Sequence, residues 1–261
     1  MNLIKRYFAF CVSLLLFGII INSCSTGPND NGSQPLPVFS STAATGDSAH
    51  AYLSNNQFDQ LNLEIDYMPG YKPDADALDS LKAFLHRRLH KSKIIIDSPT
   101  SISSGGQDSY DGQDIYNLEQ KNRDHYTTLQ KAGSDTLWAY FIIVDGQYKS
   151  DNSVLGAAYL NTSMAFFGPT IFNNSGGSFQ VSRTKLEGTV FMHEFGHNMG
   201  LVADGTPMQQ DHQAHGPHCD NKKCLMYYSV ETTDYTSILV NSPIPNLDAN
   251  CIADLQANGG K

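Results

Sequence analysis

One short run, His193-Glu194-Phe195-Gly196-His197, constrains this chain more than any other. On a helix, residues four apart lie on one face, so both imidazoles can bind a single ion from adjacent turns. His-Glu-x-x-His is a zinc-binding pattern. Glu194 would face the open side of the metal, where it could take a proton from a zinc-bound water. We therefore predict a metal-dependent hydrolytic site, over the alternative of a buried helix whose histidines only fill the core.

Gly200 stands three residues after the second histidine and predicts the end of this helix, which we place at residues 182–200. Glycine readily adopts the left-handed conformation that turns a chain back at a helix end. A third metal ligand can then come from a later loop instead of a distant helix.

The stretch from His193 to Gly200, followed by His218-Cys219 and Cys224-Leu225-Met226, resembles the metzincin metallopeptidases. Within that clan the arrangement His-Cys-x4-Cys-x-Met is most similar to the archaemetzincins. The resemblance implies that His193, His197 and His218 bind Zn2+, and that Glu194 is the catalytic base. It also implies that Met226 forms an apolar floor beneath the metal.

Tyr228 lies two residues after Met226, where some metzincins carry a tyrosine that binds the metal or stabilises the oxyanion. The resemblance therefore makes Tyr228 a candidate catalytic residue. The alternative, a wall of the specificity pocket, remains open.

The third metal ligand has several candidates. The usual clan position, three residues after the glycine, holds Ala203 here. The candidates beyond it are Asp204, Asp211, His212, His215 and His218. We favour His218 because it precedes Cys219 and stands eight residues before Met226, as the resembling pattern requires. His212 is the main alternative; with His218 as the ligand, the insertion at 202–217 would form a lid over the cleft.

The N-terminus resembles a bacterial lipoprotein signal. Lys5 and Arg6 precede an apolar run, and Ser23-Cys24 ends the segment at residues 1–23. Cleavage would leave Cys24 as a lipidated N-terminus. We therefore expect a lipid anchor in the bacterial cell envelope, at the outer membrane, facing the periplasm or the outside. A permanent anchor helix is the alternative, but the apolar run is short for one.

The five cysteines are divided by this signal. Cys11 would leave with it and Cys24 would be acylated, so three remain. In an oxidising compartment we predict a disulfide between Cys219 and Cys224. Archaemetzincins carry a later Cys-x-x-Cys that helps to bind a second zinc, whereas this chain has only Cys251 there. The sequence thus offers no complete second zinc site.

Composition predicts a flexible tether at residues 24–55, rich in Ser, Gly, Asn and Pro, before a domain at residues 56–261. The domain would comprise an N-terminal subdomain (56–200) and a C-terminal subdomain (201–261). After loss of Lys5 and Arg6 the chain carries 15 basic and 26 acidic residues, a formal charge of −11, which argues against a nucleic-acid partner. We expect a monomer acting on a peptide or protein.

The order of strands and helices predicts an α/β layered sheet. The metzincin resemblance implies that the sheet is twisted and mixed, with backing helices and an active-site helix. A small irregular C-terminal subdomain would carry the methionine turn. The resemblance implies an antiparallel edge strand within residues 157–167, where Phe166 and Phe167 either line the cleft or fill the core. We expect strands at 61–67, 93–96, 136–144, 155–160 and 163–167, a loop at 98–112, and helices at 73–91, 113–131 and 247–256.

The sequence therefore predicts a zinc-dependent endopeptidase that hydrolyses peptide bonds with a water activated by Glu194. Two alternatives remain: a catalytically silent zinc-containing binding lipoprotein, and a hydrolase of a non-peptide amide. Glu194 argues against the first, because a purely structural zinc would not need an acid beside its first ligand.

Overall fold

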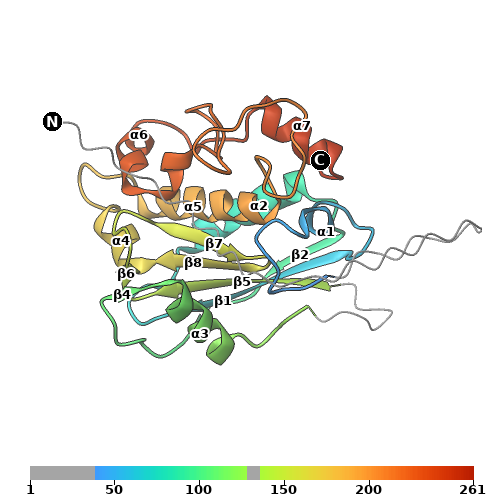
Figure 1. Ribbon diagram of the computed structural model, residues 1–261. Coiled ribbons are helices and arrows are strands. Elements are labelled where there is room, and N and C mark those ends of the chain that lie inside the picture. The colour runs from blue at the N-terminus through green and yellow to red at the C-terminus, as the bar shows by residue number, and fades with distance from the viewer. Residues whose placement is uncertain (1–38, 128–135) are drawn as a thin grey trace, which may run out of the picture. The chain divides into compact units, whose positions relative to one another are not determined.

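The protein is described by a computed structural model covering residues 39–127 and 136–261. Its centre is a twisted sheet with strand order β2-β1-β5-β8-β7, in which β3 also pairs with β1 (Figure 1). Every pair is parallel except β7–β8. The predicted mixed α/β fold is confirmed, and β7 is its antiparallel edge strand. The strands of this sheet are β1 (Gln60–Tyr67), β2 (Lys93–Ile96), β3 (Thr100–Ser101), β5 (Thr136–Val144), β7 (Gly156–Leu160) and β8 (Ser163–Phe167).

Helices cover both faces of the sheet. α2 (Ala75–Arg88) and α5 (Arg183–Asn198) lie on one face, and α3 (Gly112–Asn122) lies on the other (Figure 1). The chain after α5 is mostly irregular, as predicted. The shorter elements are α1 (Ala49–Leu53), α4 (Gly168–Asn173), α6 (Thr236–Val240), α7 (Ala249–Ala257), the 3-10 turns η1 (Tyr228–Glu231) and η2 (Thr233–Tyr235), and the paired strands β4 (Ser109–Tyr110) and β6 (Gln147–Tyr148).

Strand β5 is buried on both faces and divides the interior into two cores. Its side chains alternate, so Phe141 packs in the core beneath α2 and α5, while Ile142 packs in the core on the α3 side. Phe166 and Phe167 of β8 divide in the same way, and both are buried. Burying a side chain of this size stabilises the fold by about 1.5–3 kcal/mol. The two phenylalanines are therefore core residues and do not line a cleft.

Helix α3 is shorter than the predicted 113–131. It begins at a capping box formed by Asp111 and Asp114 and ends at Asn122, because Arg123 leaves the helical conformation. The Arg123 guanidinium is buried against Glu119 at 2.8 Å. Residues 128–131 of the predicted helix lie outside the described residues. The predicted loop at 98–112 also contains the short strands β3 and β4.

Residues 39–55, expected to belong to the tether, are packed into the fold. Phe39, Tyr52 and Leu53 are buried in the main core, and α1 covers part of this segment. The packed domain therefore includes residues 39–55, because the large apolar side chains of this segment are buried in the main core. None of the helices within residues 39–127 and 136–261 is long and apolar enough to cross a membrane.

Candidate active site

The two histidines of the predicted signature lie one turn apart on α5. This helix starts where the Ser182 hydroxyl accepts a hydrogen bond from the Lys185 N–H, and it is buried from Leu186 to its end. Nε2 of His193 lies 3.2 Å from Nε2 of His197. Two nitrogen ligands bound to one tetrahedral zinc would be about 3.3 Å apart, given Zn–N distances of about 2.0–2.1 Å. The pair is therefore spaced to share one ion.

The predicted glycine turn follows the helix. Gly200 has φ +72°, and a Cβ there would lie 2.6 Å from the Thr206 nitrogen. Val202 and Ala203 also have positive φ, at 58° and 63°. Such conformations cost non-glycine residues about 1–3 kcal/mol each, so the surrounding packing must hold them. The consequence is an abrupt reversal that returns the chain toward the helix.

His218 comes from this returning loop and completes a group of three imidazoles. Its ring centroid lies 5.4 Å from that of His193 and 5.0 Å from that of His197. Its Nδ1 lies 2.9 Å from the His215 carbonyl, and Nδ1 of His193 lies 2.7 Å from the Leu225 carbonyl. Because a carbonyl oxygen only accepts, both Nδ1 atoms donate and both Nε2 atoms keep a lone pair. Nε2 of His218 is buried and has no hydrogen-bond partner in the described residues.

The carboxylate of Glu194 is buried beside the edge strand. One oxygen, Oε2, accepts a hydrogen bond of 2.8 Å from the Ala158 N–H of β7. The other, Oε1, is buried without a hydrogen-bond partner in the described residues. Burial, and then the negative charge of Glu231, raise the pKa of Glu194 well above its usual range. A bound dication would oppose this rise, since positive charge favours the carboxylate.

His197 is held in the neutral form that coordination requires. Burial, and then repulsion from His193 and His218, lower the pKa of His197 well below its usual range. The lone pair of His197 is therefore available, and the donor set of three imidazole nitrogens fits a zinc ion.

Glu231 also belongs to this cluster, although its position was not predicted from the sequence. Its Oε2 lies 3.4 Å from Nε2 of His218 and 3.7 Å from Nε2 of His193, and the four residues form one potential metal-binding group. Burial opposes ionisation of Glu231, but its interactions with His193 and His218 hold its pKa well below the usual range. No motif marks this residue, which stands at the end of η1, five positions after Met226.

The other candidates for the third ligand lie elsewhere. The Asp204 carboxylate approaches Nδ1 of His197, at 3.9 Å, and not the Nε2 side. His212 is bonded to Asp254 at 2.7 Å, and Asp211 is exposed. The His215 ring packs against Tyr228. The structure thus brings His218, and not His212, to His193 and His197.

The ring of Tyr228 packs against the rings of two nearby residues. Its ring centroid lies 4.2 Å from that of His215 and 4.6 Å from that of Tyr227. These contacts do not distinguish a catalytic role for Tyr228 from a wall of the specificity pocket, and both stay predictions.

The methionine segment packs directly beneath α5. Met226 is fully buried, and a Cβ at Gly196 would lie 2.3 Å from its sulfur, so only glycine allows this approach. The Leu225 carbonyl holds His193, and the Met226 carbonyl accepts a hydrogen bond of 2.7 Å from the Cys219 N–H. The segment therefore positions both the first and the third histidine.

Residues 94–238 match the profile of metallo-peptidase family M12. The matched region is more than half of the chain and contains His193, Glu194, His197 and His218. The chain belongs to metallopeptidase family M12.

Solved structures similar to this M12 chain include an archaemetzincin from Methanopyrus kandleri, with 16% identity, a TM-score of 0.47, and coverage of 78% of this chain and 96% of that one. Metalloproteinase-II from Bacteroides fragilis is similar at 14% identity and a TM-score of 0.42, with coverage of 78% of this chain and 54% of that one. No curated protein sequence matches the M12 chain.

The predicted disulfide between Cys219 and Cys224 is not formed. Both residues, and Cys251, are free and buried. Sγ of Cys224 lies 3.6 Å from Sγ of Cys251 on α7. The spacing in sequence did not reveal that α7 brings a third thiol to the pair.

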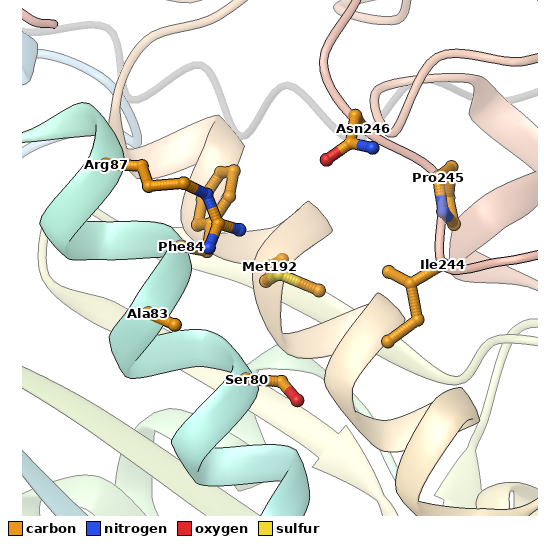
Figure 2. Close-up of a pocket in the computed structure, with 8 residues that line it drawn as sticks. All are labelled: Ser80, Ala83, Phe84, Arg87, Met192, Ile244, Pro245 and Asn246. Carbon is orange, nitrogen blue, oxygen red and sulfur yellow. The ribbon is translucent and has the colours of Figure 1, made fainter.

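A pocket of about 220 Å³ in this M12 chain lies between α2, α5 and the loop at 244–246 (Figure 2). It is lined by Ser80, Ala83, Phe84, Arg87, Met192, Ile244, Pro245 and Asn246. Met192 is the helix neighbour of His193, yet its side chain turns to this pocket. The pocket is therefore separate from the candidate active site.

Proposed function

We propose that this M12 metallopeptidase is a zinc-dependent endopeptidase in which His193, His197 and His218 hold the metal. The observation that carries the proposal is the convergence of three buried imidazoles beside a buried carboxylate oxygen without a partner. A satisfied core cluster would not leave Nε2 of His218 and Oε1 of Glu194 unpaired, because unpaired buried polar atoms are costly.

Glu194 is arranged to move the proton. When bound, zinc polarises the scissile carbonyl and makes water acidic enough to ionise near neutral pH. The Ala158 N–H fixes Oε2 of Glu194, so Oε1 is left to accept a proton from water and later deliver it to the leaving amine. General acid–base catalysis by one such group contributes typically about 10²- to 10⁴-fold.

Strand β7 supplies an edge along which a peptide would bind. An extended substrate can add to such an edge through backbone hydrogen bonds. At Ala158, however, the N–H is bonded to Glu194 and the carbonyl accepts a hydrogen bond of 3.4 Å from the Thr45 hydroxyl. A peptide would therefore pair with positions flanking Ala158 or displace Thr45. A peptide bound along β7 would then have its scissile bond next to Glu194.

A catalytically silent zinc-binding protein is favoured by one observation, the presence of Glu231. Four protein ligands would close a tetrahedral zinc site and leave no position for water. The unpartnered Oε1 of Glu194 supports the enzyme instead, because a closed site would hold no zinc-bound water from which this oxygen could accept a proton.

The deciding experiment is cleavage of a mixed peptide library by the wild type and by Glu194→Ala, each with and without a chelator. The enzyme predicts products from the wild type alone, loss with chelator and recovery with added zinc. Zinc binding without any cleavage would support the silent protein. Cleavage of a small non-peptide amide in place of peptides would support the third alternative.

The proposal extends to the place where the enzyme acts. A lipid on Cys24 would hold the monomeric domain at the bacterial outer membrane, facing peptide or protein substrates of the periplasm or the medium. The support is the N-terminal sequence alone, with Lys5 and Arg6 before an apolar run and Ser23-Cys24 after it.

A further inference from the structure

The protein's own chain covers both ends of the edge strand along which a peptide would bind. One side of β7 pairs with β8, and the other is the side to which a peptide could add. Glu194 marks this outer side, because its carboxylate accepts the Ala158 N–H. A Cβ at Gly156 would lie 3.1 Å from Cγ of Glu194. The chain segments bound on either side of this point therefore set the length of peptide that can pair with the edge.

At the start of β7, residues 231–233 already lie along the edge and form a first cover. The Leu155 N–H donates to the Glu231 carbonyl at 2.7 Å. The Thr233 N–H donates to the Ser153 carbonyl at 2.9 Å. The two segments are antiparallel where they meet. Backbone hydrogen bonds of this kind are those of a paired strand, so the first cover occupies the place that an added peptide would need there.

At the end of β7, residues 40–48 form a second cover that is anchored on Asn161. The Asn161 N–H donates to the Ala43 carbonyl at 2.9 Å. The side chain of Asn161 is fully buried; its Oδ1 accepts from the Ser48 N–H at 3.0 Å, and its amide donates to the Ser40 carbonyl at 2.7 Å. The second cover is therefore bound to the chain that directly follows the edge strand.

The gap between the two covers is short. The Thr45 hydroxyl of the second cover donates to the Ala158 carbonyl at 3.4 Å. Further along the strand, the Leu160 carbonyl accepts from the Asn198 amide of α5 at 3.1 Å. The first cover reaches Leu155 from the other side. Because a strand rises about 3.3 Å per residue, the edge from Leu155 to Ala158 is about 10 Å long, which is the length of about three paired residues.

The second cover is a fixed part of the domain. Gly46 has φ +79°, and a Cβ there would overlap the Asp204 carbonyl oxygen, so residues 40–48 are clamped between β7 and the insertion after α5. Phe39 and Tyr52, on either side of the cover, are buried in the main core. Removing the segment would expose these side chains, so it acts as a wall of the cleft and not as a detachable segment.

We propose that the two covers restrict the enzyme to short peptides, with Thr233 and Thr45 closing the two ends. The inference rests on the proposed endopeptidase function and narrows its substrate. A longer peptide would have to bend away from the sheet at each cover, where it gains no further backbone hydrogen bonds. A loop of a folded protein continues into its own fold at both ends, so it would meet both covers at once. Oligopeptides, and not intact proteins, are therefore the expected substrates.

Two series of peptides that share one cleaved bond test this inference. One series is lengthened on the N-terminal side of the bond and the other on the C-terminal side, and kcat/KM is measured with the zinc-loaded full chain. We expect kcat/KM to stop rising after the first few residues on each side. The same sequence in a protein surface loop that trypsin cleaves readily should resist this enzyme. A kcat/KM that keeps rising with length, or cleavage of the loop at the rate of the free peptide, would overturn the inference.

Peptide binding separates this inference from the proposed function. Glu194→Gln should hold zinc without turnover, and calorimetry of both series on this variant should show an affinity that stops rising at the same length as kcat/KM. If the wild type cleaves no peptide, the proposed function fails, while a plateau in affinity still supports the covers. Affinity that grows with every added residue would contradict them, and the absence of binding by any peptide would overturn both proposals.

Thr233→Pro is designed to loosen the first cover. It removes the N–H that donates to Ser153, at the first residue of η2, where the fixed φ of proline is tolerated. Thr232, the preceding residue, is extended, as a residue before proline should be. Since one hydrogen bond changes an equilibrium by about 2- to 10-fold, kcat/KM for the longest peptides should rise by that factor, while the value for short peptides stays the same.

Thr45→Val loosens the second cover, because it removes the hydroxyl that donates to Ala158, and the same selective gain for long peptides is expected. Thr42→Val is the control, since Thr42 is exposed and its hydroxyl lies 3.3 Å from that of Ser40. Where Thr233→Pro does not fold, Thr45→Val decides. No selective gain in Thr45→Val, or a gain of equal size in Thr42→Val, would overturn the assignment.

Discussion

The carboxylate oxygen Oε2 of Glu231 lies 3.4 Å from Nε2 of His218, on the side of the imidazole that would face a metal. Nδ1 of the same ring is bonded to the His215 carbonyl, so Glu231 approaches the lone pair and not the N–H. A negative charge there would attract a dication and could enter its coordination sphere. Glu231 is therefore placed to raise metal affinity and, in the resting state, to occupy the position that water needs.

We predict that Glu231→Gln lowers zinc affinity at the candidate active site by about 10- to 100-fold, as loss of a supporting group typically does. At saturating zinc, turnover should equal or exceed that of the wild type, because a neutral amide at residue 231 competes less well with water for the fourth coordination position of zinc. Competition with a fluorescent chelator measures the affinity. Asp234→Asn, an exposed acid three residues on, is the control. Unchanged zinc affinity in Glu231→Gln would show that the carboxylate does not act on the metal.

Glu194→Gln tests the proton-transfer role. The amide keeps the size of the side chain but cannot take up a proton, so turnover should fall by about 10²- to 10⁴-fold while zinc stays bound. Glu187→Gln, on the same helix, is a matched control, because Glu187 holds the Asp74 N–H at 2.6 Å and does not reach the metal group. Full activity in Glu194→Gln would remove Glu194 from the mechanism.

Elements that depend on local pattern were predicted well from the sequence. Strand β5 is an unbroken apolar run, and its observed bounds, Thr136–Val144, equal the predicted ones. Helix α5 was predicted to within two residues at each end, because Ser182 and Gly200 mark its limits in sequence. In both cases the cause of the structure lies within the segment itself.

Features that depend on distant partners were not predicted. Helix α3 stops at Asn122 because Arg123 turns to bind Glu119 and the Trp138 carbonyl, and β5 is not adjacent in sequence. Glu231 reaches the three histidines only through reversals of irregular chain. A carboxylate or an imidazole in a loop carries no local sign of such a partner, so only the folded structure reveals it.

Lys91 should be a major stabilising residue of the N-terminal segment. Its buried ammonium donates to the carbonyl oxygens of Ala51, Ser54 and Phe58 at 2.6, 2.5 and 2.6 Å. Lys91→Met would leave three buried carbonyls unpaired, and the free energy of unfolding should fall by about 3 kcal/mol, counting about 1 kcal/mol for each. Urea denaturation of this variant and of Lys93→Met measures the difference. Equal losses in the two would contradict the role, since Lys93 is exposed.

Lipid anchoring through Cys24 can be tested in cells. Labelled fatty acid should enter the wild-type chain and not Cys24→Ser, because only the thiol of a cysteine after the cleavage site can be acylated. The serine variant should also leave the membrane fraction. Cys11→Ser, inside the predicted signal, is the control and should label normally. Equal labelling of wild type and Cys24→Ser would refute the anchor.

His218→Ala decides the third ligand. With two imidazoles left on α5, the candidate active site should lose most of its zinc on dialysis, and cleavage should be lost with it. His215→Ala is the matched control. It removes a ring that packs on Tyr228 but keeps the backbone carbonyl of residue 215, which accepts the hydrogen bond from His218. If His218→Ala keeps its zinc while His212→Ala loses it, the two histidines must exchange roles, and the loop between them would have to adopt a different path from the one seen here.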